Sequence, residues 1–214
     1  MIAGIVGVPS RTAQIEKLTS VIAPSVDRVE VFMDHKYKGH WWNLSRAMEL
    51  LKEGKPGEPV LIMADDAVTV PDWRERWERI HYEAQNSIYS LLTLQRHVFN
   101  PANLQRGYVT KCQSRGFYDV AMIYIDRQTF PDDIKRWFYN EGGSRHPKVV
   151  KRSTHLDVVI QEYLIEHNIP WTVTVPTLFD HADLPSTLSH SSAGSPNYVG
   201  QPRSFLPKNI YRGT

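Results

Sequence analysis

Short apolar runs alternating with segments of helical periodicity constrain this chain more than any other feature. Residues 2–8, 29–33 and 60–64 are apolar runs with the length of buried strands. Residues 15–22 and 44–51 lie between them and repeat apolar side chains at helical spacing. Strands that alternate with helices are typical of an α/β fold with a mostly parallel central sheet flanked by helices.

The rest of the chain continues this pattern less regularly. Ser10 is expected to cap the first helix, which would bury Ile15, Leu18, Val21 and Ile22. Residues 95–116 fit no regular pattern, and residues 182–214 are rich in Ser, Pro, Gly and Asn, which predicts an irregular C-terminal arm. We expect further strands at residues 88–94, 120–125 and 171–179, the last broken at Pro176, and helices at residues 71–84, 131–138 and 156–164.

Composition narrows the class of protein. The chain has 214 residues, 41% of them hydrophobic and 22% charged, which fits one globular domain. The net charge of +2 does not by itself indicate a polyanion partner. A single cysteine, Cys112, excludes an internal disulfide and favours a reducing compartment. With no basic leader and no run of membrane-spanning length, the expected location is the cytoplasm.

Polar clusters follow the first three predicted strands. They are Pro9-Ser10-Arg11, Asp34-His35-Lys36 and Asp65-Asp66. In parallel α/β sheets, ligands bind beyond the carboxyl ends of the strands. The sequence therefore predicts a binding site in which these three clusters converge.

Two adjacent aspartates at a strand end need a compensating cation, because their like charges repel. Mg²⁺ and Mn²⁺ prefer oxygen ligands and often bridge to substrate phosphates. A turn or a helix N-terminus is the alternative explanation for such a pair. The chain lacks both the spaced glycines of dinucleotide binding and the Gly-Lys-Ser/Thr of a P-loop. Asp65-Asp66 therefore indicates a diphosphate held through a divalent metal.

Several segments together resemble the glycosyltransferases of the GT-A fold. The resemblance runs from residue 2 to about residue 188, and it rests on Gly39-His-Trp-Trp-Asn43-Leu-Ser-Arg46, on residues 60–66, and on Val175-Pro-Thr-Leu-Phe-Asp-His181. It implies a single-domain, Rossmann-like GT-A fold over residues 1–181, with residues 182–214 as an arm or lid of the same domain. It also implies transfer of a sugar, with inversion, from a nucleotide diphosphate sugar to a hydroxyl, with UDP-glucose as the expected donor.

The resemblance assigns roles to individual residues. Asp66 and His181 would bind the metal, Mn²⁺ or Mg²⁺. Asp157 lies where inverting members carry the base that takes the proton of the acceptor hydroxyl. This chain lacks a third spaced aspartate after Asp65-Asp66, and it has a single acid at position 157 where paired acids are common. The residues expected to contact the donor are Val8, Pro9, Ser10, Arg11, Asp34, Asn43, Arg46 and Asp65.

Each assignment has a structural alternative. Thr154-x-x-Asp157 has the pattern of a capping box, so Asp157 is either a base or a cap. Asn43 is also suited to capping a helix, and His181 to an ordinary surface position. Arg11 and Arg46 are alternatively solvated helix charges. Trp41 and Trp42 cannot both face one side of a helix, so one of them could offer a stacking platform.

The sequence constrains the identity of the acceptor less than that of the donor. The chain resembles small phage-encoded transferases, some of which glucosylate hydroxymethylated pyrimidines in DNA, so DNA is the expected acceptor and the host cytoplasm the expected location. A glycan or a protein side chain is the alternative acceptor. A non-catalytic nucleotide or nucleic-acid binding module and a nucleotidyltransferase stay open as other functions. The basic and aromatic residues expected to hold nucleic acid are Arg106, Lys111, Arg115, Lys148, Lys151, Arg152, Arg203, Lys208 and Arg212, with Tyr108, Phe117, Tyr198, Phe205 and Tyr211. The alternative is a solvated surface on which one or two of these cations contact the donor diphosphate.

Overall fold

A computed structural model of the chain describes residues 1–93, 98–113, 116–117, 121–139 and 156–181. The strands in these ranges are β1 (Ile2–Gly7), β2 (Arg28–Met33), β3 (Val60–Ala64), β4 (Ala67–Thr69), β5 (Ile88–Ser90), β6 (Tyr108–Lys111), β7 (Ala121–Tyr124), β8 (Trp171–Thr174) and β9 (Phe179–His181). The α-helices are α1 (Thr12–Ile22), α2 (His40–Ala47), α3 (Leu50–Glu53), α4 (Trp73–Ala84), α5 (Pro101–Arg106), α6 (Phe130–Phe138) and α8 (Leu156–Glu166).

Seven of the strands form one sheet in the order β2-β1-β3-β7-β5-β8-β6. β1 pairs in parallel with β2 and β3, and β5 pairs in parallel with β8. β7 runs antiparallel to β3 and β5, and β6 runs antiparallel to β8. Five strands therefore share one direction and two oppose it, which confirms the predicted mostly parallel sheet.

The two faces of the sheet carry alternate residues of each strand, as the pleat requires. Ala3 and Ile5 join one apolar cluster, whereas Ile2 and Val6 join the other. All six residues of β1 are buried, because both faces are covered.

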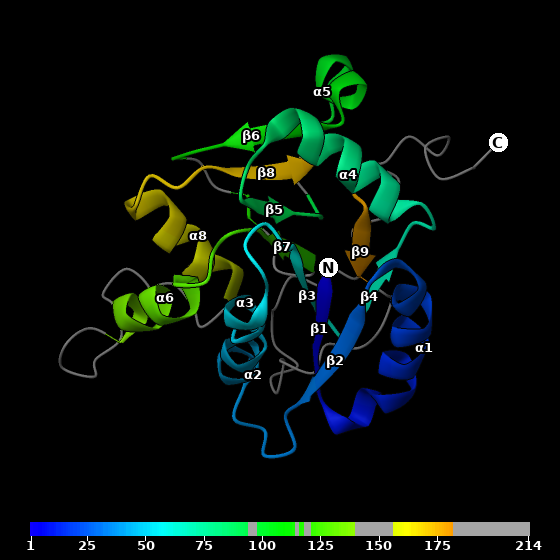
Figure 1. Ribbon diagram of the computed structural model, residues 1–214, viewed down its shortest axis with the longest axis vertical. Helices are drawn as coiled ribbons and strands as arrows, with labels where there is room; N and C mark the ends of the chain where they lie inside the picture. The colour runs from blue at the N-terminus through cyan, green and yellow to red at the C-terminus, as the bar shows by residue number, and fades with distance from the viewer. Residues whose placement is uncertain (94–97, 114–115, 118–120, 140–155, 182–214) are drawn as a thin grey trace, which may run out of the picture.

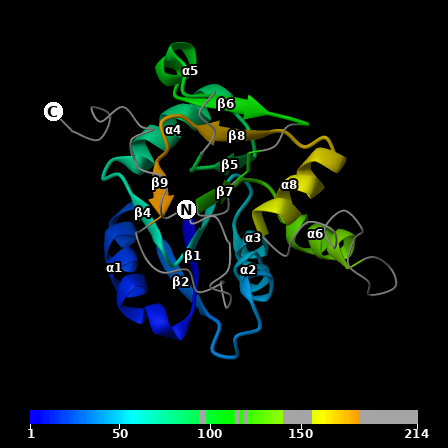
Figure 2. The same ribbon diagram turned by 180° about the vertical axis from the view of Figure 1, so that it is seen from behind.

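Helices cover both faces, so the molecule has three layers (Figure 1). The buried residues of α1 and α4 belong to one cluster, and those of α2, α3, α6 and α8 belong to the other. Figure 2 shows the same division from behind, with the short β4–β9 ribbon beside α1. β4 and β9 pair antiparallel, with Ala67 opposite His181. This second sheet brings the end of the described chain back to the acidic pair.

Most of the predicted elements are confirmed, but four details are wrong. Ser10 does not cap α1: residues Pro9–Arg11 form a 3₁₀ turn, and Arg11 holds the cap position without a side-chain hydrogen bond. Val21 is 47% exposed and lies outside the core. The helix predicted at residues 44–51 divides into α2 and α3. The strand predicted at residues 88–94 is limited to β5.

Residues 95–116 contain α5 and β6, which periodicity did not predict because both are short. The break predicted at Pro176 is confirmed, since β8 ends at Thr174 and β9 begins at Phe179. Among the described residues no helix is both long and apolar enough to cross a membrane. The predicted C-terminal arm, residues 182–214, lies outside the described residues.

Candidate functional site

One peptide unit, between Gly7 and Val8, joins the three polar clusters at the ends of β1, β2 and β3. Its N–H belongs to Val8 and donates to Asp65 Oδ2 at 3.1 Å. Its carbonyl belongs to Gly7 and accepts from the N–H of Asp34 at 2.9 Å and from Asn43 Nδ2 at 3.0 Å. The N–H and C=O of a trans peptide point in opposite directions. The acidic pair therefore lies on one side of the end of β1, and Asp34 and Asn43 lie on the other.

Arg11 is the cationic partner of the acidic pair. Its Nη1 lies 2.8 Å from Asp65 Oδ1 and 3.0 Å from Asp66 Oδ2. The side chains of Arg11 and Asp65 are 8% and 10% exposed, and that of Asp66 is 20% exposed. The 3₁₀ turn Pro9–Arg11 directs Arg11 back toward β3, and this excludes the alternative of a solvated helix charge.

Burial has the largest single effect on the pKa values of Arg11 and Asp65. It raises the pKa of the Asp65 carboxyl; Arg11 lowers that pKa and the neighbouring Asp66 raises it, so the net shift is upward. Burial also disfavours the charged guanidinium of Arg11, but Asp65 and Asp66 outweigh that effect, and the pKa of Arg11 is raised. The guanidinium therefore stays charged, while the second carboxylate makes ionisation of Asp65 harder.

Gly7 allows Asp65 to reach this position. A Cβ added to Gly7 would meet Asp65 Cβ and Oδ2 at 2.8 Å each, and Ile15 Cδ1 at 2.6 Å. Contacts this short are not tolerated, so no larger residue fits without displacing Asp65 or the packing of α1. A glycine at a strand end often marks such a close approach.

Asp34 shapes the loop between β2 and α2. The residue is buried, and its carboxylate accepts the N–H groups of Lys38 at 3.0 Å and Gly39 at 2.9 Å. Tyr37 and Gly39 have positive φ, of 49° and 100°. Asp34 therefore holds the loop in a backbone conformation that an ordinary turn would not favour.

Asn43 and Arg46 fasten α2 to the strand ends. Asn43 Nδ2 donates to Phe32 O at 2.6 Å as well as to Gly7 O. Arg46 Nη1 donates to Met33 O at 3.1 Å and to Asn43 Oδ1 at 3.3 Å. Asn43 lies inside α2, whose N-terminal cap is Gly39, so the capping alternative for Asn43 is wrong.

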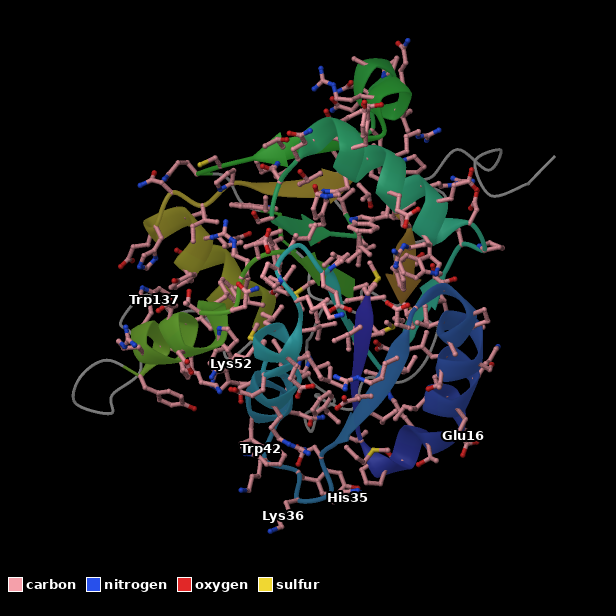
Figure 3. The ribbon with its side chains drawn as sticks, viewed as in Figure 1. Glu16, His35, Lys36, Trp42, Lys52 and Trp137 are labelled. Carbon is pink, nitrogen blue, oxygen red and sulfur yellow. The ribbon has the colours of Figure 1, made fainter. Side chains whose placement is uncertain are left out.

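A basic and aromatic surface surrounds this loop. His35, Lys36, Tyr37 and Lys38 are exposed, with Tyr37 at 69%. Lys38 Nζ and Arg46 Cζ each lie 4.7 Å from the ring centroid of Trp42, within the range of cation–π attraction. His35, Lys36 and Trp42 extend from the same end of the molecule in Figure 3.

The remaining predicted site residues come from the second half of the chain. The backbone of His181 lies opposite Ala67, the residue after Asp66, so the topology brings position 181 to the acidic pair. Asp157 lies in the first turn of α8, which packs against α6. Its Oδ1 accepts the N–H of the next residue, Val158, at 2.8 Å. Thr154 lies outside the described residues, so the capping box with Asp157 stays a prediction.

The acidic pair in this arrangement does not fit a resident divalent metal. Both oxygens of Asp65 accept hydrogen bonds, from Arg11 and Val8, and the same Arg11 nitrogen contacts Asp66. Among the described residues no group of three His, Cys, Asp or Glu side chains is placed to hold a metal ion. The predicted metal role of Asp66 and His181 stays a prediction, and we derive no step through a metal.

The basic and aromatic residues predicted to hold nucleic acid divide into three groups. Lys111 is 7% exposed and Phe117 is 2% exposed, so their prediction as surface contacts is wrong. Arg106 lies over the ring of Tyr108, with Cζ 5.8 Å from the centroid. The others lie outside the described residues: Arg115, Lys148, Lys151, Arg152, Tyr198, Arg203, Phe205, Lys208, Tyr211 and Arg212.

Two contributors to this region were missed by the sequence analysis. Gly7 was not recognised as the residue that admits Asp65, although glycine as the last residue of an apolar strand is a usable signal. The contact of Lys38 with the ring of Trp42 was not predicted either. The spacing of four residues between this lysine and the tryptophan is a usable signal for it.

Comparisons with known proteins give weak likenesses only. No family model and no curated protein matches the chain. Among solved structures, the glycosyltransferase GlyE of Streptococcus pneumoniae has a TM-score of 0.44 at 10% identity over 80% of this chain, which spans only 44% of the length of GlyE.

Two further structures have similar scores. A protein from Bacillus anthracis described as a glucose-1-phosphate thymidylyltransferase has a TM-score of 0.42 at 11% identity, over 83% of this chain and 91% of its own. The inositol-1-phosphate CTP transferase of T. maritima has 0.40 at 11% identity, over 88% and 73%. Because each TM-score is below 0.5, we draw no functional conclusion from them.

The close packing at Gly7 leads to a prediction about stability. Gly7→Ala should lower the free energy of unfolding by about 1–3 kcal/mol, because the added methyl group forces Asp65 or Ile15 to move. Urea denaturation measures this change. Gly54→Ala is the matched control: its nearest neighbour would be 3.7 Å away and its φ is −64°, so the expected change is within about 1 kcal/mol. Equal effects of the two substitutions would contradict the close approach at Gly7.

Proposed function

We propose that the chain is a glycosyltransferase, which moves a sugar from a nucleotide diphosphate sugar to an acceptor hydroxyl with inversion. UDP-glucose is the proposed donor. The sequence resemblance described above motivates the reaction class. The structural observation that supports it is the convergence of the β1, β2 and β3 ends on the Gly7–Val8 peptide.

That convergence gives the region two electrostatically different sides. Asp65 and Asp66, with Arg11, occupy one side of the end of β1. Arg46 lies on the other side, over the ring of Trp42, and the Asp34 carboxylate on that side is buried and accepts two backbone N–H groups. A nucleotide diphosphate sugar has a strongly anionic diphosphate and a neutral, hydroxyl-rich sugar. A site with a basic side and an acidic side can orient such a ligand.

In the proposed reaction the acceptor oxygen bonds to the anomeric carbon as the bond from that carbon to the diphosphate oxygen breaks. The nucleoside diphosphate leaves with the bonding electrons. Asp157 would accept the proton that the acceptor hydroxyl loses. Asp157 lies in the first turn of α8.

Nucleic acid is the proposed acceptor, with a hydroxymethylated pyrimidine in phage DNA as the substrate. Such a base would have to leave its stack before it could react. The loop at residues 35–38 supports this choice, because it combines lysines that can contact phosphates with an exposed aromatic ring that can stack on a base.

Donor binding is the first test of the proposed function. A nucleotide sugar that binds only the native state should raise the melting temperature. At a ligand concentration one hundred times the dissociation constant, it adds about 3 kcal/mol to the free energy of unfolding. A thermal-shift panel should include UDP-glucose, other nucleotide sugars and nucleoside triphosphates. Asp66→Ala should lose the shift, whereas Asp132→Ala, an exposed aspartate on α6, should keep it. A shift with a triphosphate alone would favour a nucleotidyltransferase, and no shift at all would favour a non-catalytic module.

The variant Asp157→Asn distinguishes a catalytic base at position 157 from a helix-capping residue. If Asp157 is the base, the variant keeps the donor-induced thermal shift and loses turnover by about 100-fold or more. Asparagine is nearly as good a helix-capping residue as aspartate, so the melting temperature should change little. Release of the nucleoside diphosphate with the acceptor present measures turnover. Full turnover in the variant would remove Asp157 from the mechanism.

The acceptor proposal predicts salt-dependent binding of single-stranded DNA. Lys36→Glu/Lys38→Glu should weaken binding of a fluorescent oligonucleotide at least tenfold and reduce the slope of log affinity against log salt. Lys17→Glu/Arg79→Glu makes the same change of charge at exposed positions on α1 and α4. Fluorescence anisotropy of both variants compares the two surfaces. Equal weakening would indicate a general charge effect, and no binding by the unmodified chain would favour a glycan or protein acceptor.

A further inference from the structure

Arg11 and a divalent cation would compete for the same carboxylate oxygens. Arg11 Nη1 lies within 3.0 Å of Asp65 Oδ1 and of Asp66 Oδ2. An ion that bridged these two oxygens would lie about 2.0–2.2 Å from each of them. It would therefore need the position that Nη1 holds, and its charge would repel the guanidinium.

The surroundings hold Arg11 in this position. The side chain is 8% exposed, and the Pro9–Arg11 turn that carries it begins directly after the Val8 N–H bond to Asp65. On its other side Asp65 packs closely against Gly7, where a Cβ would lie only 2.8 Å from Asp65 Cβ and Oδ2. An incoming cation that bridges Asp65 Oδ1 and Asp66 Oδ2 must therefore displace a buried arginine.

We infer that Arg11 is the permanent counter-cation of Asp65-Asp66 and excludes divalent metal from this pair. The chain's own guanidinium is then the cation that bridges the acidic pair, and Mg²⁺ or Mn²⁺ binds there only when Arg11 is removed. This departs from the metal dependence that the sequence resemblance implies.

Mn²⁺ binding to the full-length chain tests the inference, with free Mn²⁺ measured by electron paramagnetic resonance. The unmodified chain should show no site that depends on Asp66. Arg11→Gln removes the guanidinium and should create such a site, with a dissociation constant at least tenfold below that of the unmodified chain. Arg11→Gln/Asp66→Asn should lose it again. A site in the unmodified chain that disappears in Asp66→Asn would overturn the inference, as would a folded Arg11→Gln with no new site.

Arg28 offers a matched control on the surface. Its Nη2 also bridges two carboxylates, at 3.0 Å from Glu30 and 2.6 Å from Glu53, but all three side chains are at least 36% exposed. Arg28→Gln should change Mn²⁺ affinity less than twofold, because exposed carboxylates are solvated and not held together. A gain equal to that of Arg11→Gln would show that freeing any acidic pair is sufficient, and this would overturn the role given to the buried geometry.

Arg11→Gln leaves two carboxylates without their cation and could fail to fold. In that case, recovery of its circular dichroism signal on addition of Mn²⁺ supports the inference, and failure to recover contradicts it. Arg11→Lys keeps the positive charge and should bind Mn²⁺ as weakly as the unmodified chain. Neither donor nor acceptor is present in this experiment, so its result is independent of the proposed transferase reaction.

Discussion

The ion pair between Arg11 and the two aspartates is the interaction on which the rest of the site depends. Two carboxylates at the end of a buried strand would repel each other and resist burial without a cation close by. Arg11 supplies that cation from a different element, because the 3₁₀ turn after β1 turns the chain back toward β3. The position of Asp65 then requires a glycine at residue 7 and uses the N–H of Val8. The need to place a cation beside Asp65 and Asp66 thus determines the conformation of the chain from Gly7 to Arg11.

The same strand end transmits this constraint to the other side of β1. The Gly7 carbonyl accepts from Asp34 and Asn43, so the loop after β2 and the helix α2 are fixed relative to the acidic pair through one peptide unit. Asp34 in turn holds the backbone of the loop, and this leaves Lys36 and Tyr37 in solvent. A displacement of Asp65 would therefore shift the loop that carries Lys36 and Lys38, through the Gly7–Val8 peptide. The contacts described above include none between the side chain of Asp65 and those of the loop.

Periodicity in the sequence was sufficient to predict the sheet and most helices, since their burial patterns repeat over many residues. It failed at β6 and α5, which are too short to show a period, and at Val21, where the helix face is narrower than the apolar pattern. The convergence of the three polar clusters followed from the rule for parallel strands. The partnership of Arg11 with residues 54 and 55 positions away could not be predicted, because it depends on the 3₁₀ turn and on the space that Gly7 leaves.

Charge balance at the acidic pair bears on how the proposed donor would lie beside it. With both aspartates ionised, Arg11 leaves one negative charge at the acidic pair. A diphosphate would be repelled from that side and attracted to Arg46 on the other side of β1. The sugar, which is neutral, could lie near the aspartates and use them as hydrogen-bond acceptors. The guanidinium of Arg46 on α2 would then contribute to neutralising the charge of the diphosphate.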